Sequence, residues 1–150
     1  MSRKLAAICV IAVLSLGCTS GYKPETRSGG FADMQLGDNL YEVRYQGNSF
    51  TRRSEASKLL LRRCAEITLE HGKRYFATVG SLVDSSIGSA ADPGVHARIR
   101  LLAGTTDDPG RLDAVRIVEE TETLAAGKLS ERARVAIQLF NDLASKQGSH

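Results

Sequence analysis

The sequence has few of the residue patterns that mark catalytic or metal sites. Its 150 residues include three histidines and three cysteines. It contains no G-x-S-x-G turn, no H-E-x-x-H helix, no phosphate-binding Walker loop and no C-x-x-C pair. These absences remove the hydrolase, zinc-protease, nucleotide-binding and thiol-redox signatures. We therefore expect no cofactor and no metal, and we assign no catalytic residue.

The sequence also lacks a strong excess of one charge. It has 20 lysines and arginines against 17 aspartates and glutamates. Arg3 and Lys4 belong to an N-terminal segment that we expect to be removed, and without them the two totals differ by one. Nucleic-acid binding needs a clustered basic face, which the sequence does not show, so we expect no nucleic-acid partner.

No apolar run is long enough to cross a bilayer. The longest, residues 5–16, follows Arg3 and Lys4. A helix that spans a membrane needs roughly 20 apolar residues. A basic start, a short apolar stretch and a small residue at its end are typical of an export signal. We therefore predict a cleaved signal peptide over residues 1–17.

The end of this signal, Leu14-Ser15-Leu16-Gly17-Cys18, resembles the lipobox of bacterial lipoproteins. Ser15 departs from the branched aliphatic residue that is usual there. The resemblance implies cleavage between Gly17 and Cys18, acyl chains on Cys18, and attachment to a membrane. Thr19 favours the outer membrane, on the side that faces the periplasm. An ordinary secretory signal cut nearby, or an uncleaved apolar N-terminus, is the alternative.

Removal of Cys9 and lipidation of Cys18 would leave Cys64 as the one free thiol, so no internal disulfide is expected. Cys64 lies at helical spacing from Leu60 and Ile67, and free cysteine is often buried. We predict a structural role. The alternative, a nucleophile or redox sensor, needs an accessible and electropositive setting.

Residue periodicity predicts an α+β domain over residues 38–145, preceded by a flexible tether over 18–37 and followed by a disordered tail over 146–150. Apolar residues alternate along 41–45 and 95–101, as in half-buried strands, and a third short strand is predicted over 75–79. A helix over 52–71 lies between the strand over 41–45 and the strand over 75–79, with Thr51 as its N-terminal cap and Gly72 at its C-terminal end. The elements thus follow a β-α-β-β order and form a small sheet of about three strands under a long amphipathic helix.

Two C-terminal segments complete the domain. Residues 111–126 are predicted as a helix, although 115–118 also fits a strand, and residues 129–144 form a second amphipathic helix. In the long helix, Arg62 and Glu66 are spaced to pair at i and i+4 on the side opposite the apolar stripe. We expect that side to face solvent.

The central region resembles a family of small uncharacterised proteobacterial lipoproteins. The resemblance lies in the run Arg63-Cys64-Ala65-Glu66-Ile67-Thr68-Leu69, followed by Gly72-x-x-Tyr75-Phe76. These proteins share an R-C-A-E-[IL]-T-L helix that leads into a G-x-x-Y-F strand. The resemblance covers roughly residues 40–118 and implies lipidation and a similar fold. It implies no activity.

Two groups of residues are candidates for anion or partner contact. Arg53 and Arg63 lie at the border of the apolar stripe, where each either pairs with an acid such as Glu42 or Asp38 or binds an anionic ligand. The second group is a basic row on the polar side of the strand over 95–101. It comprises His96, Arg98 and Arg100.

We therefore expect a non-enzymatic interaction or structural module of the cell envelope, bound to a membrane through Cys18. Its partner would be an anionic lipid or an envelope protein. The alternative is an envelope hydrolase or redox enzyme built around Arg63, Cys64 and His71, although His71 at the end of a helix also suits a capping role. A small-ligand carrier is a third hypothesis, but we expect a core of this size to hold no cavity.

Overall fold

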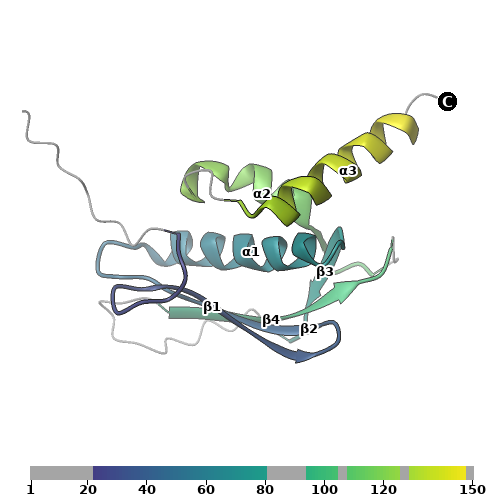
Figure 1. Ribbon diagram of the computed structural model, residues 1–150. Coiled ribbons are helices and arrows are strands. Elements are labelled where there is room, and N and C mark those ends of the chain that lie inside the picture. The colour runs from purple at the N-terminus through teal and green to yellow at the C-terminus, as the bar shows by residue number, and fades with distance from the viewer. Residues whose placement is uncertain (1–21, 81–93, 105–107, 126–128, 148–150) are drawn as a thin grey trace, which may run out of the picture.

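The computed structural model describes residues 22–80, 94–104, 108–125 and 129–147 (Figure 1). The predicted signal peptide, Gly17, Cys18 and the loop over 81–93 lie outside the described residues. The described elements are β1 (Gly30–Gly37), β2 (Leu40–Gln46), α1 (Arg53–Glu70), β3 (Tyr75–Thr78), β4 (Gly94–Leu102), β5 (Arg111–Asp113), α2 (Ala114–Glu120), the 3-10 helix η1 (Glu122–Ala125) and α3 (Glu131–Gln147).

The α+β fold is confirmed, with a larger sheet than predicted. Five strands form one sheet in the order β1-β2-β4-β3-β5, and every neighbouring pair is antiparallel. Figure 1 shows three layers, in which α1 lies on the sheet and α2 and α3 lie beyond α1. All described helices are therefore on one side of the sheet, and none of them covers the opposite side.

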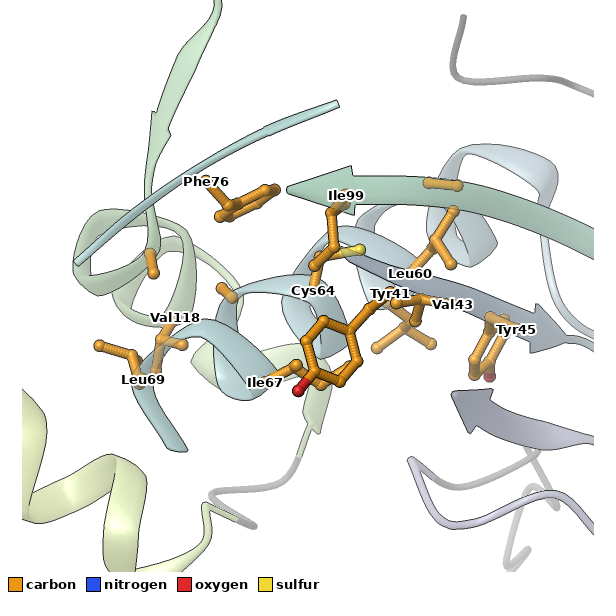
Figure 2. Packing of buried hydrophobic residues seen from close by; sticks show 14 of the residues in the cluster. Tyr41, Val43, Tyr45, Leu60, Cys64, Ile67, Leu69, Phe76, Ile99 and Val118 are labelled. Atoms are coloured by element: carbon orange, nitrogen blue, oxygen red, sulfur yellow. The ribbon is translucent and has the colours of Figure 1, made fainter. Parts of the chain in front are cut away.

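The core fills the space between α1 and the sheet (Figure 2). Because successive strand residues point to opposite faces, the predicted alternation places Val43 and Tyr45 of β2 beside Ile99 of β4 on the covered face. From α1, Leu60 and Cys64 point into the same space and are buried. The predicted apolar stripe thus packs on the predicted apolar strand faces.

The sequence predicted the C-terminal end of α1 correctly and its N-terminal cap wrongly. The predicted Thr51 cap is wrong: the N-cap residue is Arg52, which makes no side-chain cap. The Thr51 hydroxyl instead bonds within the preceding turn, where it accepts the N–H of Asn48 at 3.1 Å. The C-terminal prediction is confirmed, because Gly72 has a φ of +66° and its N–H donates to the carbonyl of Leu69 at 2.9 Å.

The predicted tether is wrong from Tyr22 onward. Tyr22 is 7% exposed, and its ring lies 4.9 Å from that of Phe31. Phe31 is the second residue of the edge strand β1, where its N–H donates to the carbonyl of Lys23 and its carbonyl accepts the N–H of Glu25. The α1 side of β1 carries Asp33, which pairs with an arginine instead of entering the apolar core, so the sequence shows no apolar alternation there.

The C-terminal part also differs in detail. Residues 111–126 begin as strand β5 before α2, and the stretch over 115–118 is helical. The break has a local cause, because the Asp113 carboxylate accepts the N–H groups of Val115 and Arg116 and so starts α2. Helix α3 continues to Gln147, two residues into the predicted tail. Among the described residues, no helix is long and apolar enough to cross a membrane.

Candidate functional site

The side of the sheet away from α1 is basic, and we call it the basic face. Because Val43 and Ile99 point toward α1, their neighbours along the strands point the other way. The register places Arg44 opposite His96, and Arg98 opposite Glu42. Continuing across the sheet, Ala77 lies between the partners Arg100 and Arg111. The predicted basic row is therefore part of a larger surface, which comprises Arg44, Arg98, Arg100, Arg111 and His96. Arg74 adjoins this surface, with its guanidinium carbon 5.5 Å from the centre of the Tyr75 ring.

Two ion pairs among the described residues join arginines of this surface, or beside it, to carboxylates. Arg98 pairs with Glu42 at 3.0 Å, and Arg74 pairs with Asp113 at 2.9 Å. The hydrogen bond from Arg74 to Asp113 raises the pKa of that guanidinium. With the adjoining Arg74, the described part of the face thus carries five arginines against three carboxylates, because Glu25 lines a pocket with Arg44 and His96. This local excess contrasts with the near neutrality of the chain.

Exposed apolar side chains lie next to the basic face. Met34 of β1 is 56% exposed and stands opposite Glu42 in the register. Leu36, near the end of the same strand, is 41% exposed. Arginines beside exposed apolar side chains are typical of surfaces that contact an interface with a charged layer and an apolar layer.

The two other candidate arginines do not join this face. Arg63 forms an ion pair, as one of the two hypotheses expected, but its partner is Asp33 at 2.9 Å and not Glu42 or Asp38. Its guanidinium also lies 4.6 Å from the centre of the Phe31 ring. Arg53 is exposed at the start of α1. Arg63 therefore binds the edge strand to α1.

The structure does not assemble an active site from Arg63, Cys64 and His71. Cys64 is fully buried, and burial raises the pKa of its thiol to about 12. Nδ1 of His71 donates to the carbonyl of Ile67 at 2.8 Å, and Nε2 accepts from the Tyr41 hydroxyl at 2.8 Å. Both ring nitrogens are therefore engaged locally, and no described hydrogen bond or ion pair joins two of the three residues. No group of three possible metal ligands occurs in the described part of the chain.

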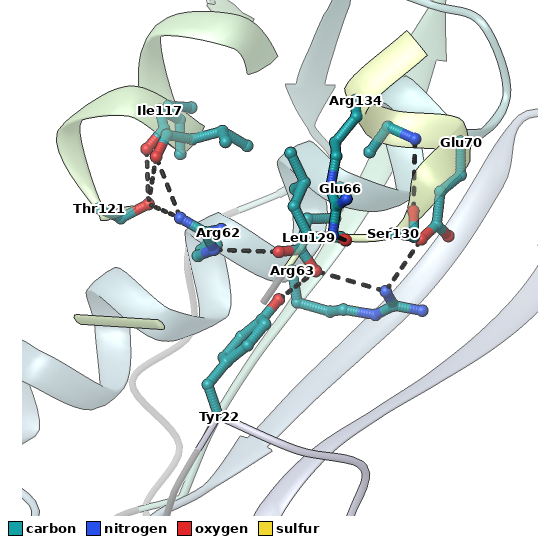
Figure 3. Close-up of polar contacts among 12 residues, drawn as sticks. Tyr22, Arg62, Arg63, Glu66, Glu70, Ile117, Thr121, Leu129, Ser130 and Arg134 are labelled. Atoms are coloured by element: carbon teal, nitrogen blue, oxygen red, sulfur yellow. Dashed lines mark hydrogen bonds and ion pairs between the residues drawn. The ribbon is translucent and has the colours of Figure 1, made fainter. Parts of the chain in front are cut away.

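A buried polar cluster lies on the side of α1 away from the sheet (Figure 3). The sequence pattern predicted that this side of the helix faces solvent. Arg62, however, is 1% exposed and Glu66 is 3% exposed. Nε of Arg62 donates to Glu66 at 2.9 Å, and Nη1 donates to the Val118 carbonyl at 3.0 Å. The predicted spacing for a pair was right, but α2 and α3 cover it.

Tyr22 completes the polar cluster from the N-terminal side. Its hydroxyl donates to Oε2 of Glu66, while Oε1 accepts from Arg62. Burial raises the pKa of the Glu66 carboxyl, and the bonds from Tyr22 and Arg62 oppose this rise. Burial and the adjacent carboxylate raise the pKa of the Tyr22 hydroxyl. The cluster thus joins the N-terminal segment, α1 and α2 through buried hydrogen bonds.

Comparison with known proteins finds no family model, no curated protein and no solved structure that matches this chain.

Proposed function

We propose that the protein is a non-enzymatic lipoprotein of the outer membrane, anchored through acyl chains on Cys18 and facing the periplasm. In this proposal the basic face binds the phosphate groups of anionic phospholipids in the same membrane. The observation that carries the proposal is the excess of arginines on a sheet face that no described helix covers. Arginine suits this role because its planar guanidinium binds phosphate oxygens in pairs.

The start of the fold supports a position close to the membrane. Only three residues separate Cys18 from Tyr22, which is buried in the domain. Four residue steps span at most ~14 Å of extended chain. A lipidated Cys18 would therefore hold the domain against the headgroups, with little clearance.

The path of the N-terminal segment supports contact through the sheet. The segment lies against the edge strand, since Pro24 forms an isolated parallel bridge with Phe31. An anchor that enters at the edge of a sheet allows the open face of that sheet to lie on the bilayer. Met34 and Leu36 would then reach the boundary between headgroups and acyl chains.

Vesicle binding tests the face without the anchor. Protein that begins at Thr19, and so carries no acyl chain, is sedimented with vesicles of phosphatidylglycerol or of phosphatidylcholine. Each basic residue near an anionic surface contributes about 1 kcal/mol. Replacing Arg44, Arg98 and Arg100 by Gln should therefore weaken binding to phosphatidylglycerol vesicles by about 100-fold. Added salt should weaken binding of the wild-type protein to the same vesicles, because salt screens the charges.

A matched variant controls for total charge. Lys58, Arg116 and Lys146 are exposed on α1, α2 and α3, and their replacement by Gln should change vesicle binding little. Equal losses in the two triple variants would refute a specific face. Binding to an acidic envelope protein with no binding to either vesicle would assign the face to a protein partner instead.

A separate experiment tests the anchor. We expect Cys18→Ala to release the protein into the soluble periplasmic fraction or to leave it as an unprocessed precursor. Mass spectrometry of the wild type should find acyl chains on the N-terminal cysteine of the mature chain. Mature, membrane-bound protein in the Cys18→Ala strain would contradict lipidation.

A further inference from the structure

A cleft of about 400 Å³ is lined by residues of α2, η1 and α3. These helices lie on the side of α1 away from the sheet, so the cleft and the basic face are on opposite sides of the domain (Figure 1). The apolar lining of the cleft comes from Val118, Leu129 and Ile137. Arg62 of the polar cluster also lines it. The volume falls within the range of pockets that hold small molecules.

Arg62 lines this cleft and has hydrogen-bond donors that no described acceptor uses. A guanidinium has five N–H groups, and those of Arg62 that find acceptors are on Nε and Nη1. Among the described residues, no acceptor reaches Nη2, which carries two N–H groups. A buried donor without a partner costs about 1–3 kcal/mol. A side chain that is 1% exposed and lines a cleft therefore favours a ligand with an acceptor.

The rim of the cleft restricts the charge of such a ligand. Glu119, Glu122 and Asp142 line the opening and are exposed. Arg134 is also there, but its guanidinium donates to the carbonyl of Leu129 at 3.0 Å and lies 3.5 Å from Glu131. Three carboxylates at the opening repel a dianion more strongly than a monoanion. The apolar wall meanwhile suits a hydrocarbon body.

We infer that the cleft is a binding site for small monocarboxylates with a compact apolar body. The carboxylate accepts from Nη2 of Arg62 at the inner end, and the apolar body packs between Val118, Leu129 and Ile137. Glu66 holds the guanidinium in place through Nε, and Tyr22 stacks over it with 5.6 Å between the guanidinium carbon and the ring centre. This site is independent of the basic face and of the membrane anchor.

Calorimetry with three probes of similar shape tests the charge selection. The protein, as the cell processes it and held in nanodiscs, is titrated with 3-phenylpropionate, with neutral 3-phenylpropanol and with phenyl phosphate. We expect 3-phenylpropionate to bind at least tenfold more tightly than either of the others. The Nη resonances of Arg62 should shift on binding of this probe. Equal affinity for the alcohol, or no saturable binding of the carboxylate, would overturn the inference.

A pair of substitutions on one helix tests the location. Ile137→Trp fills the cleft and should weaken binding of 3-phenylpropionate at least tenfold. Val135→Trp places the same side chain at a position of α3 that is 57% exposed and outside the cleft, and binding should stay within twofold of the wild type. Unchanged binding in a folded Ile137→Trp variant would refute the site. The double variant Arg62→Met with Glu66→Gln should lose the preference for carboxylate over alcohol, and if it does not fold, the tryptophan pair decides.

Discussion

Replacement of Tyr22 by Phe tests whether the N-terminal segment belongs to the folded domain. The variant keeps the ring that packs on Phe31 and removes only the hydroxyl that donates to Glu66. Glu66 is 3% exposed, so its Oε2 would lose a close donor in a buried setting. Arg63, at 3.5 Å, would remain as a weaker contact.

The expected cost is about 1–3 kcal/mol in the free energy of unfolding, which is the range for leaving a buried acceptor unsatisfied. For a domain of this size, each kcal/mol corresponds to a fall of roughly 2–6 °C in Tm. Urea unfolding of the chain that begins at Thr19 measures the change directly. The urea midpoint should fall while the slope m stays constant, because the buried area hardly changes.

Two controls make this result specific. Tyr75→Phe removes a hydroxyl on the basic face and should cost less than about 0.5 kcal/mol, as most surface changes do. In a double-mutant cycle with Glu66→Gln, the effects of the two changes should not add, because they share one interaction. A Tyr22→Phe cost below about 0.3 kcal/mol, with additive effects in the cycle, would show that the segment is a loose tether.

Three further predictions concern buried and capping groups. Cys64 should react with a thiol reagent at pH 8 at least 100-fold more slowly in the native protein than in urea, because burial raises its pKa to about 12; rapid native labelling would contradict the core packing. Asp113→Ala should destabilise the domain by about 1–2 kcal/mol, because the carboxylate caps α2 and pairs with Arg74. Asp113→Asn, which keeps a capping oxygen, should cost less, and equal losses would rule out the capping argument. Because the folded pKa of Glu66 is raised, its contribution to stability is complete below the ordinary glutamate pKa of about 4.3 and decreases as the pH rises through the folded value. Glu66→Gln should flatten this fall in a pH series of urea midpoints, and an unchanged pH profile would contradict it.

The sequence predicted the elements whose apolar residues all enter one core. Val43, Tyr45 and Ile99 alternate cleanly because α1 covers their side of the sheet. Strand β1 escaped prediction because it lies at the edge, where α1 covers it less and an ion pair between Asp33 and Arg63 replaces apolar packing. Apolar and polar residues alternate along a strand when one of its faces is buried in the core, and an edge strand buries little of either face.

The misplaced polar cluster has a related cause. A helix with one apolar stripe is expected to show its other side to water, and Arg62 and Glu66 fit that expectation. Helix α1, however, lies between the sheet and the layer of α2 and α3, and its second interface contains the buried pair of Arg62 and Glu66. The sequence showed the spacing of the pair, but the burial of the pair depends on α2, α3 and Tyr22, which lie 40 residues or more away along the chain. The sequence predicted the basic row for the same reason as the core, because alternation along β4 places its apolar residues on one face of the sheet and its basic residues on the other.

The pairing of the edge strand bears on crowding. Proteins fixed to one surface meet their neighbours at high local concentration, and open strand edges are places where copies join into aggregates. At one end of this sheet, β5 is only three residues long. At the other end, Lys23 and Glu25 already occupy the backbone groups of Phe31 at the start of β1. The segment that connects the domain to its proposed anchor therefore also shields part of the edge through which crowded neighbours would otherwise associate.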